Sequence, residues 1–344
     1  MLRFAKLKEK DSACISIKKI GGTNMKKIIL SSLIVLTLGL AACGNSGTKN
    51  TDATSGTETS TSEVIKKEVT ITDGNGEITV PYQPKKVVVF DNSALDTINV
   101  LGLKDVVIGA PTSNLPSFLT DFETVESAGG IKEPDLEKIN AMQPDLIIIS
   151  GRQRDFLPDL EKIAPTIFFE VDSTDTWNSI QHNALAIGQI FGKEAEVEVA
   201  LGDLELQIAE TKEKAEASGE KALVVLMNEG ELSAYGKGSR FSIIHDTFGF
   251  KQSDENIEAS THGQNVSYEY ILKQNPDIIF VVDRTKAVGG DQSETSLADN
   301  DLVKDTNAGK NGKVIVLNSE VWYLAGSGLE SLKIMLEDVN QALK

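Results

Sequence analysis

Apolar residues fall in short runs that alternate along the chain with helical stretches, and this pattern predicts an α/β fold. Two runs, LIIIS and IIFVV, are apolar on both faces, which is typical of parallel strands covered by helices. Glu68–Pro81 contains an Asn-Gly turn between alternating residues and is predicted to be a hairpin. We expect further strands at 85–90, 105–110, 145–150, 166–170, 221–227, 277–282 and 313–318, and helices at 176–192, 193–219 and about 327–343.

One pattern occurs twice. The segments Glu137–Arg152 (EKINAMQPDLIIISGR) and Glu269–Arg284 (EYILKQNPDIIFVVDR) share the spacing E-x-I-x4-P-D, an apolar run and a final Arg, without a gap. Because Pro144 and Pro276 cannot continue a helix, each copy predicts a short helix, a Pro-Asp turn and a strand. Two similar halves indicate two similar lobes with a cleft between them.

The two ends of each copy carry different chemistry. Arg152 and Arg284 directly follow their strands, and the carboxyl ends of strands in open α/β sheets face the ligand crevice. Glu137 and Glu269 open the preceding helices, at the opposite end of each unit. A carboxylate there is stabilised by the helix dipole, so a capping role and a partner-docking role both remain open.

A long Glu- and Lys-rich helix at 193–219 is predicted to join an N-terminal lobe at 66–192 to a C-terminal lobe at 220–344. About 25 helical residues span about 38 Å. A single stiff connection of this length is expected to restrict hinge closure. The alternative is that the helix packs on one lobe only.

The segment 25–42 has the features of a bacterial lipoprotein signal peptide. Lys26 and Lys27 precede the apolar stretch 28–40, which is too short to span a membrane, and small residues precede Cys43. Cleavage before Cys43 would leave a lipid-bearing N-terminus; the alternative is a Cys that follows a signal peptide by chance.

The residues on either side of this segment are not expected to fold. Residues 1–24 resemble neither a signal nor a domain, and we expect translation to start at Met25. Residues 43–65 are rich in Gly, Ser, Thr and Asn and are predicted to be a flexible tether. Cys14 would be absent from the mature chain, which leaves no disulfide and no Cys-based metal site.

The chain is acidic, with 34 Lys and Arg against 51 Asp and Glu and a net charge of −17. Removal of residues 1–42, which hold 8 basic and 2 acidic residues, would change the net charge to −23. Nucleic acid is excluded as a partner, because phosphate binding needs a basic surface.

Arginine is rare and its positions are informative. The mature chain would retain only Arg152, Arg154, Arg240 and Arg284, and Arg240 lies in the Gly-rich segment YGKGSRFSIIHD. Arg154 is expected to face solvent or to cap a helix. Arginine stays charged, donates in a planar fork and stacks on aromatic rings. Arg152, Arg240 and Arg284 around one cleft would form an anion site; the alternative is three separate structural ion pairs.

Several segments together resemble iron-siderophore-binding lipoproteins of ABC importers, in the branch that binds ferric catecholates of petrobactin and enterobactin type. The most specific are SRFSIIHD and VWYLAGSGLESLK, and the likeness covers about 66–344. The resemblance implies two Rossmann-like lobes joined by a single long α-helix (the class III periplasmic binding protein fold). It also implies a ligand in the cleft and three cleft-lining arginines, matched by Arg152, Arg240 and Arg284.

The resemblance further places His262 and Tyr323 in the cleft. Both side chains can ligate Fe(III), so with a tetradentate siderophore they would complete the coordination of the metal. With a hexadentate siderophore they would make hydrogen bonds or packing contacts. The alternatives are a loop histidine bonded to backbone for His262 and packing beside Trp322 for Tyr323. His182 and His245 are interpreted as core or surface helix residues.

The resemblance implies partners as well. Glu137 and Glu269 match the carboxylates that dock on the permease, which works with its ATPase. The ligand would be an Fe(III)-siderophore complex, with no intrinsic cofactor. We expect a monomer held by the lipid on Cys43 at the outer face of the cytoplasmic membrane, in a Gram-positive cell envelope. A binding protein rather than an enzyme is expected, since no G-x-S-x-G motif is present. Heme or cobalamin binding, or a secreted lipoprotein enzyme or sensor, are the alternatives.

Overall fold

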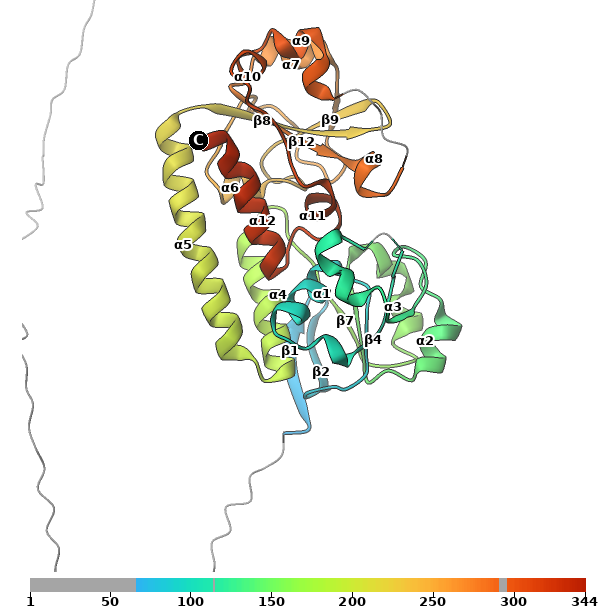
Figure 1. Cartoon of the computed structure of the whole chain (residues 1–344). Coiled ribbons are helices and arrows are strands. Elements are labelled where there is room, and N and C mark those ends of the chain that lie inside the picture. Colours follow the sequence, from blue (N-terminus) through green and yellow to red (C-terminus); the bar gives the residue numbers. More distant parts are fainter. Residues whose placement is uncertain (1–65, 114, 291–295) are drawn as a thin grey trace, which may run out of the picture. The chain divides into compact units, whose positions relative to one another are not determined.

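The computed structural model describes residues 66–113, 115–290 and 296–344 (Figure 1). The predictions for residues 1–24, for the signal peptide 25–42 and for the tether 43–65 with Cys43 lie outside the described residues. No described helix combines the length and the apolar character that crossing a membrane requires.

The N-terminal lobe is built on a five-stranded parallel sheet with the order β5-β4-β3-β6-β7. Every residue of β6 is buried, as its apolar run predicts. The apolar side chains of α1 and α4 pack on one face of the sheet, and those of α2 and α3 on the other. The strands are β3 (Val87–Val89), β4 (Val107–Ala110), β5 (Glu126–Ser127), β6 (Leu146–Ile149) and β7 (Thr166–Phe168); the helices are α1 (Asn92–Val100), α2 (Leu136–Met142), α3 (Leu157–Leu160) and α4 (Thr176–Phe191).

The C-terminal lobe has a mixed six-stranded sheet. β8, β12 and β13 are parallel, β10 pairs parallel with β8, and β9 runs antiparallel to both β8 and β11. The strands are β8 (Lys221–Asn228), β9 (Glu231–Tyr235), β10 (Lys251–Gln252), β11 (Gln264–Val266), β12 (Ile278–Asp283) and β13 (Val314–Val316). The helices are α6 (Ile243–Asp246), α7 (Tyr268–Gln274), α8 (Arg284–Ala287), α9 (Asp301–Lys304), α10 (Asn307–Lys310), α11 (Ser319–Leu324) and α12 (Leu329–Asn340).

Shorter elements complete the two lobes. The predicted hairpin is formed by β1 (Glu68–Asp73) and β2 (Gly76–Pro81), and Asp73 Oδ2 accepts a 2.9 Å hydrogen bond from Phe168 N of β7. Short 3-10 turns occur at Lys104–Val106, Ser117–Phe122, Gly151–Phe156, Leu297–Asp299 and Gln341–Leu343.

The repeated segments form the same joint in both lobes. Helices α2 and α7 each end in a left-handed residue, Gln143 at φ 48° and Asn275 at φ 44°, directly before the Pro-Asp pair. The strand then starts at once, so the helix and the strand of each copy meet at a sharp turn, as the Pro residues predict.

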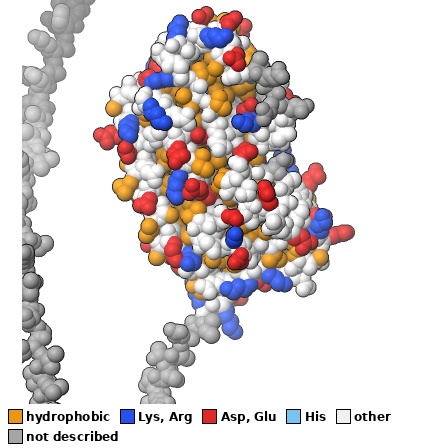
Figure 2. Space-filling view, viewed as in Figure 1, with side chains coloured by type: hydrophobic (Ala, Val, Ile, Leu, Met, Phe, Trp, Pro, Cys, Tyr) orange, Lys and Arg blue, Asp and Glu red, His pale blue; other side chains and the backbone are white. Residues whose placement is uncertain are grey.

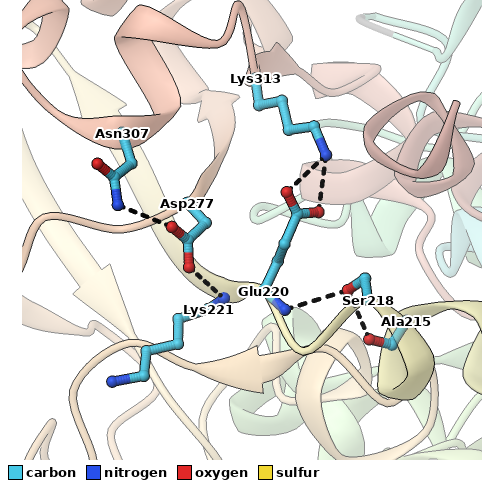
Figure 3. Close-up of polar contacts among 7 residues, drawn as sticks. All are labelled: Ala215, Ser218, Glu220, Lys221, Asp277, Asn307 and Lys313. Carbon is cyan, nitrogen blue, oxygen red and sulfur yellow. Dashed lines mark hydrogen bonds and ion pairs between the residues drawn. The ribbon is translucent and has the colours of Figure 1, made fainter.

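The aspartates of the two Pro-Asp pairs fasten each turn to the neighbouring strand. Asp145 Oδ2 accepts hydrogen bonds from Lys85 N at 2.9 Å and Lys86 N at 3.0 Å, beside the start of β3. Asp277 Oδ2 accepts one from Lys221 N at 3.0 Å, at the start of β8 (Figure 3). The repeat therefore sets the register between adjacent strands in each lobe.

The long connecting helix α5 (Glu194–Ser218) has the 25 residues that the sequence predicts. It packs against α4 of the N-terminal lobe and α12 of the C-terminal lobe (Figure 1). One hydrophobic core contains side chains of α4, α5 and α12 and of strands β8 and β12. The helix therefore contacts both lobes, and the alternative of packing on one lobe does not hold.

The end of α5 is fixed to the C-terminal sheet. Gly219 adopts φ 66°, and Ser218 Oγ accepts a 3.1 Å hydrogen bond from Glu220 N while it donates to Ala215 O. Both carboxylate oxygens of Glu220 lie 2.7 Å from Lys313 Nζ, and each of these side chains is 25% exposed (Figure 3). This half-buried ion pair holds the start of β8 beside the start of β13.

Candidate functional site

A cavity of about 590 Å³ lies between the two lobes. Its N-terminal side is formed at the carboxyl ends of β3, β6 and β7, where the sequence predicts ligand-facing residues. Its C-terminal side is formed by the segments around Arg240, His262 and Tyr323. The lining residues are Asp91, Ser93, Ser150, Gly151, Arg152, Phe169, Glu170, Val171, Ser173, Thr176, Arg240, Phe241, Ile243, Thr261, His262, Trp322, Tyr323, Leu324, Ala325, Gly326, Ser327 and Met335.

Two arginines from opposite lobes meet at one backbone carbonyl. The carbonyl oxygen of Tyr323 accepts hydrogen bonds from Arg152 Nη2 at 2.8 Å and from Arg240 Nη2 at 2.6 Å. Burial and the neighbouring charge of Arg240 lower the pKa of Arg152, while Asp91 acts in the opposite direction. Two like charges are thus held side by side in the cavity wall, where a bound anion would relieve their repulsion.

Tyr323 is also surrounded by cationic groups at its ring. The guanidinium carbon of Arg240 lies 4.1 Å from the ring centroid, and Arg284 Nε donates a 2.8 Å hydrogen bond to the phenol oxygen. Burial raises the pKa of Tyr323, but the hydrogen bond from Arg284 and the charges of Arg240 and Arg284 outweigh it and lower the pKa below its ordinary value. The two arginines therefore stabilise the phenolate form of Tyr323 relative to that of a free tyrosine side chain.

Arg284 belongs to this network without lining the cavity. It is absent from the cavity lining, and besides Tyr323 it donates to Asn228 Oδ1. The sequence places Arg284 correctly at a strand end, and in the structure its guanidinium is engaged by the Tyr323 phenol group and by Asn228. Arg284 therefore acts on the cavity through the phenol group.

The three arginines form one cluster rather than separate ion pairs. Within the described residues, none of Arg152, Arg240 and Arg284 forms an ion pair with a carboxylate. Arg154 differs: it is exposed, pairs with Glu170 at 3.5 Å and lies over the Phe168 ring. Figure 2 shows Lys and Arg interspersed with acidic side chains over the viewed face, in contrast to the unpaired cluster in the cavity.

His262 lies exposed at the cavity and is fixed through its backbone. Its N–H donates to Ser260 Oγ at 3.1 Å, and its carbonyl accepts from Tyr235 Oη at 2.9 Å. The imidazole makes no hydrogen bond to any residue in 66–113, 115–290 or 296–344, so among these residues it is the backbone of His262 and not its ring that is bonded.

The other two histidines are engaged elsewhere. His182 Nε2 lies 2.9 Å from Thr72 O, and the buried His245 pairs its Nδ1 with Phe250 O at 2.9 Å. Burial lowers the pKa of His245. Among the residues that the structure describes, no group of three or more His, Cys, Asp or Glu side chains is placed to hold a metal ion.

Sequence reasoning missed Asp91 and Ser93 as cavity residues. Asp91 lies two residues after the end of β3, caps α1 by accepting from Ser93 N at 2.8 Å, and lines the cavity near Arg152. Burial raises the pKa of Asp91, against its hydrogen bonds from Ser93 and Ala94 and the charge of Arg152. The Asp-x-Ser pattern after an apolar strand was the available signal, since it marks a helix start at the ligand-facing end of a strand.

Glu137 and Glu269 lie away from the cavity. Both are exposed in the first turns of α2 and α7, after the caps Asp135 and Ser267. A hydrogen bond with the Ser267 side chain lowers the pKa of Glu269. Exposure of both carboxylates is compatible with docking, which stays a prediction.

The chain matches the model of a family described as periplasmic binding protein over residues 87–321. It is 44% identical over 323 residues to the petrobactin-binding protein YclQ of Bacillus subtilis, covering 93% of this chain and 100% of that protein. The crystal structure of YclQ superposes with a TM-score of 0.79 over 81% of this chain and 99% of that one, at 45% identity.

Two further solved structures are similar. The iron uptake ABC transporter substrate-binding protein PiuA of Streptococcus pneumoniae has a TM-score of 0.77 at 43% identity, over 80% of this chain and 99% of PiuA. The periplasmic catecholate-siderophore binding protein VctP of Vibrio cholerae has a TM-score of 0.74 at 34% identity, over 80% and 99%. The expected two-lobe fold with a long connecting helix is thereby confirmed, and the chain belongs to the periplasmic binding protein family.

Proposed function

We propose that this protein is the substrate-binding component of an ABC importer and captures a ferric catecholate-type siderophore in the cavity between its lobes. The observation that carries the proposal is the pair of guanidinium groups, Arg152 and Arg240, that converge on Tyr323 O and form no ion pair with a carboxylate among the described residues. The similarity to YclQ, PiuA and VctP supports the same class of ligand.

The charge of the ligand matches the cluster. A ferric tris-catecholate carries about three negative charges, so one Arg at about 6 Å and an effective dielectric of about 20 attracts it by roughly 8 kcal/mol before desolvation. Catechol rings also offer faces on which Arg240 and Phe241 can stack. The volume of about 590 Å³ is in the range of small-molecule pockets.

Tyr323 and His262 are proposed to contact the iron centre directly when the siderophore leaves coordination positions open. The Arg284 hydrogen bond and the arginine charges lower the pKa of Tyr323 against the effect of burial, so its deprotonation to a phenolate, a hard oxygen donor, becomes easier. His262 offers a ring without a hydrogen-bond partner among the described residues. With a hexadentate ligand, both side chains would contact the organic part instead.

Delivery is proposed to use the opposite surface. Glu137 and Glu269, one on each lobe, would dock on basic sites of the permease, whose ATPase drives import. The lipid on Cys43 would hold the protein at the outer face of the cytoplasmic membrane, within reach of that permease.

The proposal is tested by titrating the mature protein with ferric catecholates, ferric hydroxamates and heme while tryptophan fluorescence is recorded. Trp322 lines the cavity and should report occupancy. Ferric catecholates are expected to bind most tightly. Equal or tighter binding of heme or of a hydroxamate would overturn the catecholate assignment.

A further inference from the structure

The residue before helix α12, Gly328, cannot cap the helix with a side chain. Gly328 has no side chain to accept from the free N–H groups of the first turn, and such groups need partners. Asp96 of α1 supplies them from the other lobe: its Oδ2 accepts from Ser331 N at 2.8 Å and its Oδ1 from Glu330 N at 3.1 Å. A carboxylate of the N-terminal lobe thus caps a helix of the C-terminal lobe.

A second contact lies beside the first. Ser93, also on α1, shares a 2.7 Å hydroxyl–hydroxyl hydrogen bond with Ser327 and accepts from Ser327 N at 3.2 Å. The chain from Ser327 to Ser331 is therefore bound to α1 through three of its residues, Ser327, Glu330 and Ser331. The apolar side of α1 belongs to the N-terminal core, whereas that of α12 belongs to the core shared with α5.

Glycine at position 328 is needed for this approach. A Cβ atom added to Gly328 would overlap the carboxylate of Asp96. Any other residue at position 328 would therefore push α1 and α12 further apart.

Burying the Asp96 carboxylate in this position is unfavourable for the folded state. It is 1% exposed, and among the described residues it has no ion-pair partner. Burial raises its pKa to about 6 against its hydrogen bonds from Ser331 and Glu330, and the charge of Glu330, itself paired with Lys333 at 3.0 Å, adds to the rise. A group that is unfavourable for folding calls for a positional reason.

The segment that Asp96 anchors lies next to Tyr323 in the chain. Only residues 324–326 separate Tyr323 from the anchored Ser327, and the Tyr323 carbonyl is held by Arg152 of the same lobe as Asp96. We infer that Asp96 is a positioning residue: by capping α12 across the lobe junction, it holds the segment 323–328 so that the Tyr323 carbonyl and ring stay in register with Arg152 and Arg240. This inference rests on the proposed function only where its test measures affinity for the ligand.

The test uses Asp96→Asn in the mature protein, with Asp135→Asn as the matched control. Asp135 also caps a helix, by accepting from Lys138 N at 3.1 Å, but within one lobe and at the surface. Affinity for a ferric tris-catecholate should fall about tenfold or more in Asp96→Asn, as expected when a hydrogen bond to a charged acceptor is lost, and should be unchanged in Asp135→Asn.

Hydrogen–deuterium exchange of the ligand-free proteins gives a readout independent of the ligand. If Asp96 positions Tyr323, exchange in Asp96→Asn should accelerate throughout 323–328. A purely local cap would accelerate only the amides of Glu330 and Ser331, and that result, or unchanged affinity, would overturn the inference.

If the wild type binds no ferric catecholate, the proposed function fails while the exchange data still decide the role of Asp96. Should Asp96→Asn not fold, Ser93→Ala and Gly328→Ala perturb the same junction from either side. They are expected to weaken binding and to accelerate exchange in the same segment; normal affinity and exchange in both would contradict the inference.

Discussion

Replacing Asp96 by Asn is expected to remove a pH dependence from the free energy of unfolding. Burial raises the pKa of Asp96 from 3.8 to about 6 in the folded protein. A group whose folded pKa is raised contributes stability that is fully present below its unfolded pKa and is lost as the pH rises through the folded pKa. Between these two values the folded protein holds a proton that the unfolded chain has released.

The magnitude follows from the size of the shift. At about 1.4 kcal/mol per pKa unit, the change from 3.8 to about 6 corresponds to about 3 kcal/mol. The quantity to follow is the free energy of unfolding of the wild type minus that of Asp96→Asn. This difference should fall by about 3 kcal/mol between about pH 4 and pH 7 and stay constant at higher pH.

Urea unfolding followed by tryptophan fluorescence at a series of pH values measures this difference. Asp135→Asn is again the control. Its backbone hydrogen bond from Lys138 lowers the pKa of Asp135, so the stability contributed by that carboxylate is lost as the pH falls, with the opposite sign. A wild-type-minus-Asp96→Asn difference that is constant over the range, or that grows with pH, would refute the reasoning.

Three further predictions concern the binding site and its partners. Arg240→Ala should weaken ferric-catecholate binding well over tenfold, because it removes both a charge and a ring contact at Tyr323; unchanged affinity in a fluorescence titration would exclude Arg240 from the site. Glu137→Arg combined with Glu269→Arg should abolish cellular iron uptake while leaving binding intact, and normal uptake would contradict the docking role. Tyr323→Phe should change the charge-transfer absorption of tetradentate ferric complexes only; an effect confined to hexadentate complexes would oppose iron ligation.

The regular elements follow from local sequence signals. The apolar runs and Pro-Asp turns predict the parallel strands, and the Gly192 and Gly219 stops predict where α4 and α5 end. Strand β9 was missed because its run ELSAY is short and half polar, although the two-residue turn at Glu229 and Gly230, with φ of 52° and 89°, is a hairpin signal.

The site was predictable in its residue types and less so in its geometry. Arg152 and Arg240 meet at the Tyr323 carbonyl, whereas Arg284 donates to the phenol oxygen and is not among the described residues that line the cavity. The role of Asp96 is invisible in the sequence, since a carboxylate within an amphipathic helix gives no sign of a partner in the other lobe. Such contacts depend on how the lobes are placed, which no local pattern encodes.

The core shared by α4, α5 and α12 has a consequence for the transport cycle. Moving the lobes apart would bring buried side chains of this core into water, at about 1.5–3 kcal/mol for each large aliphatic or aromatic residue. Wide opening is therefore thermodynamically unfavourable. Cargo is expected to leave through rearrangement of the segments around Arg240, His262 and Tyr323, driven at the permease, rather than by separation of the lobes in solution.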